Sequence, residues 1–220
     1  HYVKDKEKDE YYCVDNTPEI LKYGIKNYAN GDERAFIEAY FDNIVEMVHT
    51  QKPDIIGHLD LVRKFNKDLK YFDENAEWYK NKVEYVLDEI AKTDAIIEIN
   101  TGGMSRGWTQ TPYPSVPILE KILAKNIPIT ISSDAHETKN INFYFEESLE
   151  IARKIGFKSV KILDGVRGQA PIPREKFAEV VTRVSLLMDA APEIFEMDLN
   201  PLLGTEKGVV AVDARIRIVR

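Results

Sequence analysis

Histidine and aspartate side chains follow two short apolar segments of this sequence. His58 comes directly after the run 54–57, and Asp134 and His136 lie two and four residues after the run 128–132. Imidazole nitrogens and carboxylate oxygens are common ligands of divalent metals in proteins. In the Asp134-x-His136 pair, the two side chains point the same way if extended backbone continues through them. These residue types in this spacing indicate a metal site.

A glycine-rich segment follows a third apolar run. The run 95–99 leads into residues 100–107, which include two consecutive glycines, Gly102 and Gly103. Glycines let the backbone approach a ligand closely, so a phosphate-binding loop is one interpretation. A plain turn is the other, and the glycines alone do not choose between them.

Each of the other motifs also has a simpler interpretation. His58 alone fits a packed or capping histidine, and Asp134 with His136 fits a hydrogen-bonded pair in a loop. His49 lies inside a predicted helix, and we interpret it as structural or exposed. The three segments nevertheless follow successive predicted strands, and this combination favours a metal site over the separate interpretations.

Helical and extended patterns alternate along the first 164 residues. In the segment 34–51, apolar residues at four-residue spacing form one stripe, as expected of a helix. Helix-then-strand units joined by short links predict an α/β fold with parallel strands covered by helices, either part of a β/α barrel or an open sheet. In such barrels, chemistry lies at the carboxyl ends of the strands. The predicted helices are 34–51, 76–91, 115–125 and 143–155, and the predicted strands are 54–57, 95–99, 128–132 and 158–163.

Composition excludes several classes of protein. The chain has 220 residues, 44% of them hydrophobic, which is enough for a packed core. The formal charge of -7 argues against general binding to nucleic acid. We expect no membrane partner, because no apolar stretch approaches the roughly 20 residues of a membrane span. The single cysteine, Cys13, and the absence of a signal-peptide pattern fit a cytoplasmic protein.

The composition changes near residue 165. Residues 1–164 hold 18 Lys and 4 Arg, whereas residues 165–220 hold 2 Lys and 6 Arg. All 11 Tyr and 11 of the 12 Asn also lie in the first part. A short C-terminal domain with its own bias is one explanation. We favour a junction of two unrelated sequences around 163–165.

The first part, residues 1–164, resembles the PHP superfamily, most closely the monofunctional histidinol phosphatases. That family has a distorted β/α barrel that binds a cluster of divalent metals of zinc, iron or manganese type. The resemblance implies metal-dependent hydrolysis of a phosphate monoester, L-histidinol phosphate, in histidine biosynthesis. It further implies that Arg106 contacts the substrate phosphate and that Asp60 orients a histidine from the second coordination shell. The resemblance rests on His1-Tyr2-Val3, on IIGHLDLVRKF at 55–65, on IEINTGGMSRG at 97–107 and on ISSDAH at 131–136. The implied metal ligands are His1, His58, Asp134 and His136, of which Asp134 and His136 are also the candidate catalytic residues.

One part of the family pattern is missing from this sequence. The family opens with a His-x-His motif followed by a further His and a Glu, all upstream of the residue that matches His1. We therefore expect a partial barrel with open strand edges, at most one or two weakly bound metals, and little or no phosphatase activity for the chain as given.

The second part, residues 165–220, is similar to the C-terminal end of the ATP-grasp domain of NDP-forming acyl-CoA synthetases. The similarity is carried by GVRGQAPIPREKFAEVVTRVSLLMDAAPEIFEMDLNPLL and GVVAVDARI. It predicts a small α+β appendage with a helix over 173–189 and paired strands over 194–203 and 208–219. In that family, residues matching Asn200 and Asp213 hold the magnesium of the nucleotide; here we expect vestigial positions.

Two other functions compete with the phosphatase. The chain could be a fragment of an acyl-CoA synthetase, but the core of an ATP-grasp domain is not found in it. It could also be a catalytically dead fusion that acts only as a binding surface.

Overall fold

The computed structural model comprises two compact units. The first is formed by His1–Ala135 with Lys139–Val160, and the second by His136–Thr138 with Lys161–Arg220. The structure describes residues 1–5, 7–160, 174–198, 202–205, 208–211 and 215–218.

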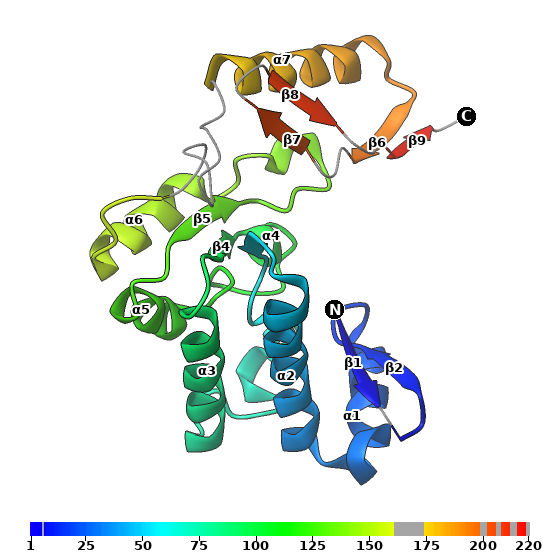
Figure 1. The fold of residues 1–220 in the computed structure, drawn as a ribbon. Helices are drawn as coiled ribbons and strands as arrows, with labels where there is room; N and C mark the ends of the chain where they lie inside the picture. Colours follow the sequence, from blue (N-terminus) through cyan, green and yellow to red (C-terminus); the bar gives the residue numbers. More distant parts are fainter. Residues whose placement is uncertain (6, 161–173, 199–201, 206–207, 212–214, 219–220) are drawn as a thin grey trace. The chain divides into compact units, whose positions relative to one another are not determined.

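The first unit contains a three-stranded parallel sheet, two strands of which are labelled in Figure 1. Its strands are β3 (Ile55–Ile56), β4 (Ile96–Asn100) and β5 (Ile129–Ser132), in the order β3-β4-β5. All three strands were predicted, and their parallel pairing confirms the α/β class. Because parallel strands end at the same edge, the segments after β3, β4 and β5 are brought together there.

Four of the helices in the first unit match the predicted ones closely. They are α2 (Glu33–Gln51), α3 (Glu77–Ile90), α5 (Val116–Ala124) and α6 (Phe145–Ile155). Helices α2 and α3 lie side by side (Figure 1), and α3 also packs against α5. The apolar stripe expected on α2 turns inward, with Phe36, Tyr40 and Val48 all buried. The helices thus bury the periodic apolar positions on which their prediction was based.

A hairpin and a helix at the N-terminus were not anticipated. Strands β1 (Tyr2–Asp5) and β2 (Glu10–Cys13) pair antiparallel, and α1 (Pro18–Asn27) follows with Thr17 as its N-cap. The backbone of His1 joins this hairpin, since its carbonyl accepts a hydrogen bond of 2.9 Å from the Val14 N–H. The hairpin therefore fixes the position of the first residue.

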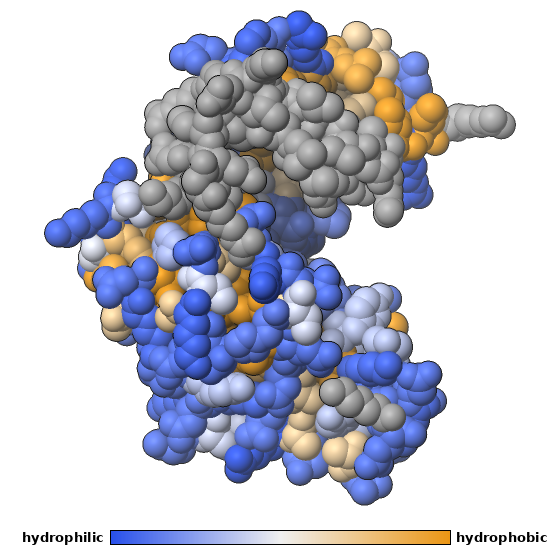
Figure 2. Space-filling view, viewed as in Figure 1, coloured by the Kyte–Doolittle hydropathy of each residue, from blue (hydrophilic) through white to orange (hydrophobic). Residues whose placement is uncertain are grey.

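The described residues of the second unit form one long helix and two pairs of short strands. Helix α7 (Arg174–Ala190) precedes β6 (Ile194–Asp198), β7 (Leu202–Thr205), β8 (Gly208–Ala211) and β9 (Arg215–Ile218). Strand β6 pairs with β9 and β7 with β8, both antiparallel, as expected for two long strands meeting at a turn. Hydrophobic residues gather over β6 and β9 (Figure 2), where Ile216 and Ile218 are exposed.

Several expectations concern residues outside the described ranges. The predicted junction around 163–165 lies there, as do Asn200 and Asp213. Of the predicted strand 158–163, the described part, 158–160, has no strand structure. No helix formed by the described residues has the length and apolar character to cross a membrane.

Candidate metal and phosphate site

Two predicted metal ligands, His1 and His58, lie next to each other. Their ring centroids are 4.8 Å apart with the rings edge to face. The Nδ1 atom of His1 lies 2.9 Å from Oδ2 of Asp15, and this hydrogen bond raises the pKa of His1. A carboxylate that holds one imidazole nitrogen leaves the other free to coordinate a metal. The pair therefore has the form of two metal ligands, one of them braced by Asp15.

His58 is held in a strained backbone conformation directly after β3. Its φ angle is +28°, a region that non-glycine residues rarely adopt and that costs about 1–3 kcal/mol. The His58 N–H donates a hydrogen bond of 2.9 Å to Oε2 of Glu98, which also accepts from Asn100 Nδ2 at 2.9 Å. Burial lowers the pKa of His58, and the positive charge of His1 adds to this effect. Glu98 on β4 thus fixes the backbone of a candidate ligand in the segment after β3.

Arg106 and Asp134 meet at the same edge of the sheet. The guanidinium donates from Nη2 to Asp134 Oδ2 at 2.9 Å and from Nη1 to the Asp134 carbonyl at 3.0 Å. Gly102 makes this contact possible, since a Cβ there would lie 2.6 Å from Arg106 Nη2 and 3.0 Å from Asp134 Oδ2. The amide of Asn100 accepts from the Gly102 N–H at 2.9 Å and so connects this loop to Glu98. The glycine-rich segment therefore seats Arg106 against Asp134.

The negative charge of Asp134 acts to raise the pKa of both His1 and His58. The pKa of His1 is set mainly by Asp15 and that of His58 mainly by burial, but Asp134 acts on both. The segment containing His136 belongs to the second unit, so His136 is not placed relative to these residues and remains a predicted ligand.

The donor groups fit part of a metal centre. Among the described residues, no three His, Cys, Asp or Glu side chains are arranged to hold a metal ion. The neighbouring imidazoles of His1 and His58, with a carboxylate behind one of them, suit a divalent metal in chemical type. The described residues thus supply a pair of candidate ligands rather than a closed site.

The structure corrects the role expected for Asp60. Its side chain is fully buried, and Oδ2 accepts from the Ser115 N–H at 2.9 Å and lies 3.6 Å from Arg63 Nη1. Its Oδ1 has no hydrogen-bond partner among the described residues. Burial raises the pKa of Asp60 to about 6. Asp60 holds the start of α5 instead of orienting a histidine.

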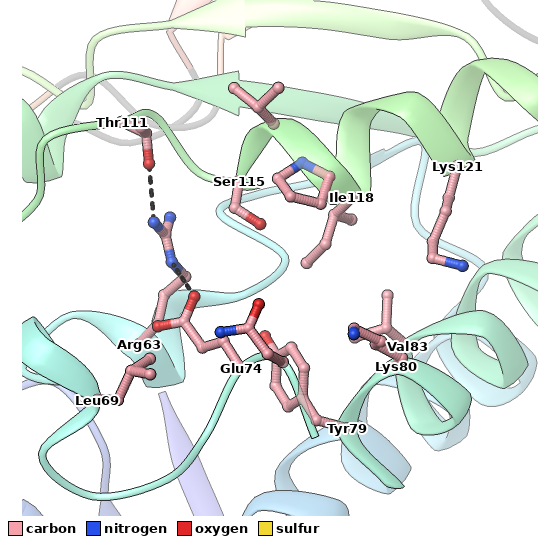
Figure 3. A pocket seen from close by; sticks show the side chains of 13 residues that line it. Arg63, Leu69, Glu74, Tyr79, Lys80, Val83, Thr111, Ser115, Ile118 and Lys121 are labelled. Atoms are coloured by element: carbon pink, nitrogen blue, oxygen red, sulfur yellow. Dashed lines mark hydrogen bonds and ion pairs between the residues drawn. The ribbon is translucent and has the colours of Figure 1, made fainter. Parts of the chain in front are cut away.

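Arg63 joins this buried network to a cavity of about 330 Å³. Figure 3 shows the guanidinium between Thr111 and Glu74, at 2.8 Å from Thr111 Oγ1 and 3.4 Å from Glu74 Oε2. Tyr79 and Ile118 also line the cavity, but none of the predicted metal or phosphate ligands does. The candidate site is therefore separate from this cavity.

His49 lies apart from the predicted ligands. Its Nε2 is 2.9 Å from Oε2 of Glu89, which joins α2 to α3, and half of its side chain is exposed. This agrees with its interpretation as a structural or exposed histidine.

Three residues of the site were not anticipated: Asp15, Glu98 and Asn100. Glu98 and Asn100 alternate at the end of β4, so a polar pair in an otherwise apolar strand was an available signal. Asp15 lies in the N-terminal region, where no element was predicted, and nothing near it in the sequence points to His1.

Comparison with known proteins finds similarity to two different groups of proteins. It is 25% identical over 152 residues to a protein named as a histidinol-phosphatase in Schizosaccharomyces pombe, covering 69% of this chain and 49% of that protein. It is 28% identical over 144 residues to a histidinol-phosphatase of Bacillus subtilis, covering 64% of this chain and 52% of that protein. The chain thus spans about half the length of these relatives.

A solved structure supports the fold of the first part. The chain superposes with a TM-score of 0.59 on a Listeria monocytogenes structure, hisK, described as a histidinol phosphatase, at 22% identity. The match covers 67% of this chain and 55% of that one.

The end of the chain matches a different group of proteins. Residues 150–218 match the model of the ATP-grasp domain family. The chain is also 41% identical over 71 residues to the beta subunit of an ADP-forming acetate–CoA ligase of Pyrococcus furiosus, covering 32% of this chain and 30% of that protein. Both resemblances expected from the sequence are therefore confirmed.

Proposed function

We propose that residues 1–164 are part of a metal-dependent phosphate monoester hydrolase of PHP type, with L-histidinol phosphate as substrate. The observation that carries this proposal is that His1 contacts His58, that Arg106 contacts Asp134, and that the charge of Asp134 acts on both histidines. The similarity of the same residues to histidinol-phosphatases supports the choice of substrate.

His1 and His58 would hold a divalent metal of zinc, iron or manganese type, together with Asp134 and, in the proposal, His136. When bound, such a metal lowers the pKa of water to near neutrality and polarises phosphate oxygens. Asp15 keeps His1 in one orientation, and Glu98 keeps the backbone of His58 in place. These contacts define where the reacting phosphate would lie.

Arg106 would bind the phosphoryl oxygens. Its planar guanidinium can offer two parallel N–H groups to an anion. In the structure, two of its N–H groups contact Asp134, so a phosphate would compete with Asp134 for them. Asp134 or His136 would carry the proton to the leaving alcohol.

The test is to measure metal content by mass spectrometry together with hydrolysis of L-histidinol phosphate. The chain as given should hold at most one or two weakly bound metals and show little or no turnover. A longer version, in which a segment carrying His-x-His and its following His and Glu precedes His1, should hydrolyse the ester. Failure of the longer protein to do so would contradict the phosphatase proposal.

In that longer protein, Arg106→Ala should reduce turnover at least about tenfold, because one charge-assisted contact is lost. Arg106→Lys should recover only part of the activity, since an ammonium lacks the paired N–H groups. Unchanged kinetics in Arg106→Ala would remove Arg106 from the proposal.

A second candidate concerns residues 165–220. The match to the ATP-grasp domain and to an ADP-forming acetate–CoA ligase favours a fragment of an acyl-CoA synthetase. In that reading, Asn200 and Asp213 are vestigial ligands of a magnesium–nucleotide complex. An assay for ATP-dependent formation of acyl-CoA by the chain tests this candidate. If no acyl-CoA forms, the synthetase candidate is contradicted, and the phosphatase or a catalytically dead fusion remains.

A further inference from the structure

Lys64 has an unusual position close to the candidate site. It follows the short 3-10 helix η2 (Leu61–Arg63) and is half-buried. Its ammonium donates a hydrogen bond of 2.6 Å to the carbonyl of Asp15, the residue whose carboxylate contacts His1. This hydrogen bond holds the Lys64 ammonium close to the residue that contacts His1.

The same ammonium also contacts the loop that carries Arg106. It lies 5.6 Å from the ring centroid of Trp108, two residues beyond Arg106, and 5.1 Å from that of Phe65. These two rings pack edge to face at 5.0 Å. Two aromatic faces and one carbonyl therefore hold the amine in place between His1 and the glycine-rich loop.

The charges near Lys64 are mixed. Burial lowers the pKa of the amine, Asp15 acts against this, and the positive charge of Arg106 lowers it further. Asp134 acts in the same direction as Asp15. The ammonium of Lys64 and the guanidinium of Arg106 thus act on each other at an edge where the carboxylates of Asp15 and Asp134 balance their charge, so an anion bound there would compete with those carboxylates for the two cations.

Lys64 retains the capacity to bind that anion. An ammonium has three N–H donors, and the hydrogen bond to Asp15 uses one. The aromatic contacts need no donor in a fixed direction. Two N–H groups therefore stay available for a ligand oxygen.

We propose that Lys64 and Arg106 form a two-cation clamp for the phosphoryl group of a phosphate monoester. Arg106 supplies a planar pair of donors from the loop after β4, and Lys64 supplies a point charge from the segment after β3. A phosphate dianion has the charge and the number of acceptor oxygens to occupy both. This inference rests on the proposed function, because it assigns a second phosphate ligand to the same site.

The clamp can be tested by calorimetric titration of the 220-residue chain with inorganic phosphate. Lys64→Gln should weaken phosphate binding about tenfold, the scale of one charge-assisted contact. Lys64→Arg should retain most of the affinity because it keeps the charge. Lys67→Gln serves as the matched control: Lys67 is an exposed lysine three residues away, and its loss should change the affinity less than about twofold.

Thermal unfolding of each variant separates binding from folding. If Lys64→Gln alone unfolds at a lower temperature, the phosphate affinity of Lys64→Arg is compared with that of the wild-type chain instead. Replacement of both Lys64 and Arg106 should abolish phosphate binding. Equal affinities for Lys64→Gln and Lys67→Gln would overturn the clamp, and so would a wild-type chain that binds no phosphate. A chain that binds phosphate through both cations but hydrolyses no ester, even in the longer form, would contradict the proposed function alone.

Discussion

The two units of this chain differ in how far their apolar side chains are buried. In the first unit, the apolar faces of α2, α3 and α5 are buried in one core, and polar side chains are concentrated where the strands end. In the second unit, Val181, Leu186 and Leu187 of α7 are exposed, as are Ile216 and Ile218 of β9. A unit with its own core can hold a site in fixed geometry, whereas exposed apolar faces are typical of a piece that packs on something else.

The comparisons with other proteins fit this difference. The first unit matches about half of each histidinol-phosphatase and still encloses a core. The second matches only one end of a larger ligase chain. The predictions that follow test whether the contrast between the units holds.

The largest expected effect is in the core of the first unit. Phe41 is fully buried, and its ring contacts Tyr40 at 5.2 Å and Tyr79 at 5.8 Å between centroids. Phe41→Ala should lower the free energy of unfolding by about 3–5 kcal/mol because it leaves a cavity. Urea denaturation followed by tryptophan fluorescence reports on this unit, since Trp78 and Trp108 both lie in it. A loss below about 1 kcal/mol would mean that the core is loosely packed.

A smaller effect is expected at Gly102. A Cβ there would overlap Arg106 Nη2 and press on Asp134, so Gly102→Ala should cost about 1–3 kcal/mol of stability. It should also weaken phosphate binding because Arg106 is displaced. In an Arg106→Ala background the same glycine substitution should cost less, since the closest overlap is gone. Equal costs in both backgrounds would show that Gly102 does not act through Arg106.

The next effect concerns Glu98, whose side chain accepts a hydrogen bond from the His58 N–H. Glu98→Gln keeps the size of the side chain but removes the charge that accepts from the His58 N–H and the Asn100 amide. Zinc affinity, measured by titration against a chromophoric chelator, should fall about 10- to 100-fold, the range known for residues that support metal ligands. Glu120→Gln on the exposed face of α5 is the control and should leave the affinity unchanged. Equal zinc affinities in the two variants would separate Glu98 from the metal site.

The smallest effect is expected in the second unit. Leu186 is 62% exposed, so Leu186→Ala should change the free energy of unfolding by less than about 0.5 kcal/mol. Far-ultraviolet circular dichroism during denaturation measures it. A loss of 2 kcal/mol or more would mean that this face of α7 is covered in solution, and the contrast between the units would not hold.

Much of the first unit could be predicted because its elements are regular. Periodic apolar residues located α2 and α3, and short apolar runs located β3, β4 and β5. The rule that parallel strands end at one edge then brought His58, Arg106 and Asp134 together. Each of these inferences depends on local pattern and on a general property of α/β folds.

The remaining features depend on contacts between distant residues. Asp15 reaches His1 through the pairing of β1 with β2, and no periodic pattern marks such short strands. The family resemblance implies that Asp60 orients a histidine, yet its side chain contacts Ser115 and Arg63. Sequence spacing indicates which edge a residue lies near but does not indicate its partner.

The central claim is that the edge where β3, β4 and β5 end binds a divalent metal. The chain has 4 histidines, so a zinc titration followed by nuclear magnetic resonance of ¹⁵N-labelled imidazoles tests it directly. If this edge binds the metal, the ring signals of His1 and His58 should shift together while that of His49, paired with Glu89, stays unchanged. Zinc binding that shifts His49 and leaves His58 unaffected would contradict it.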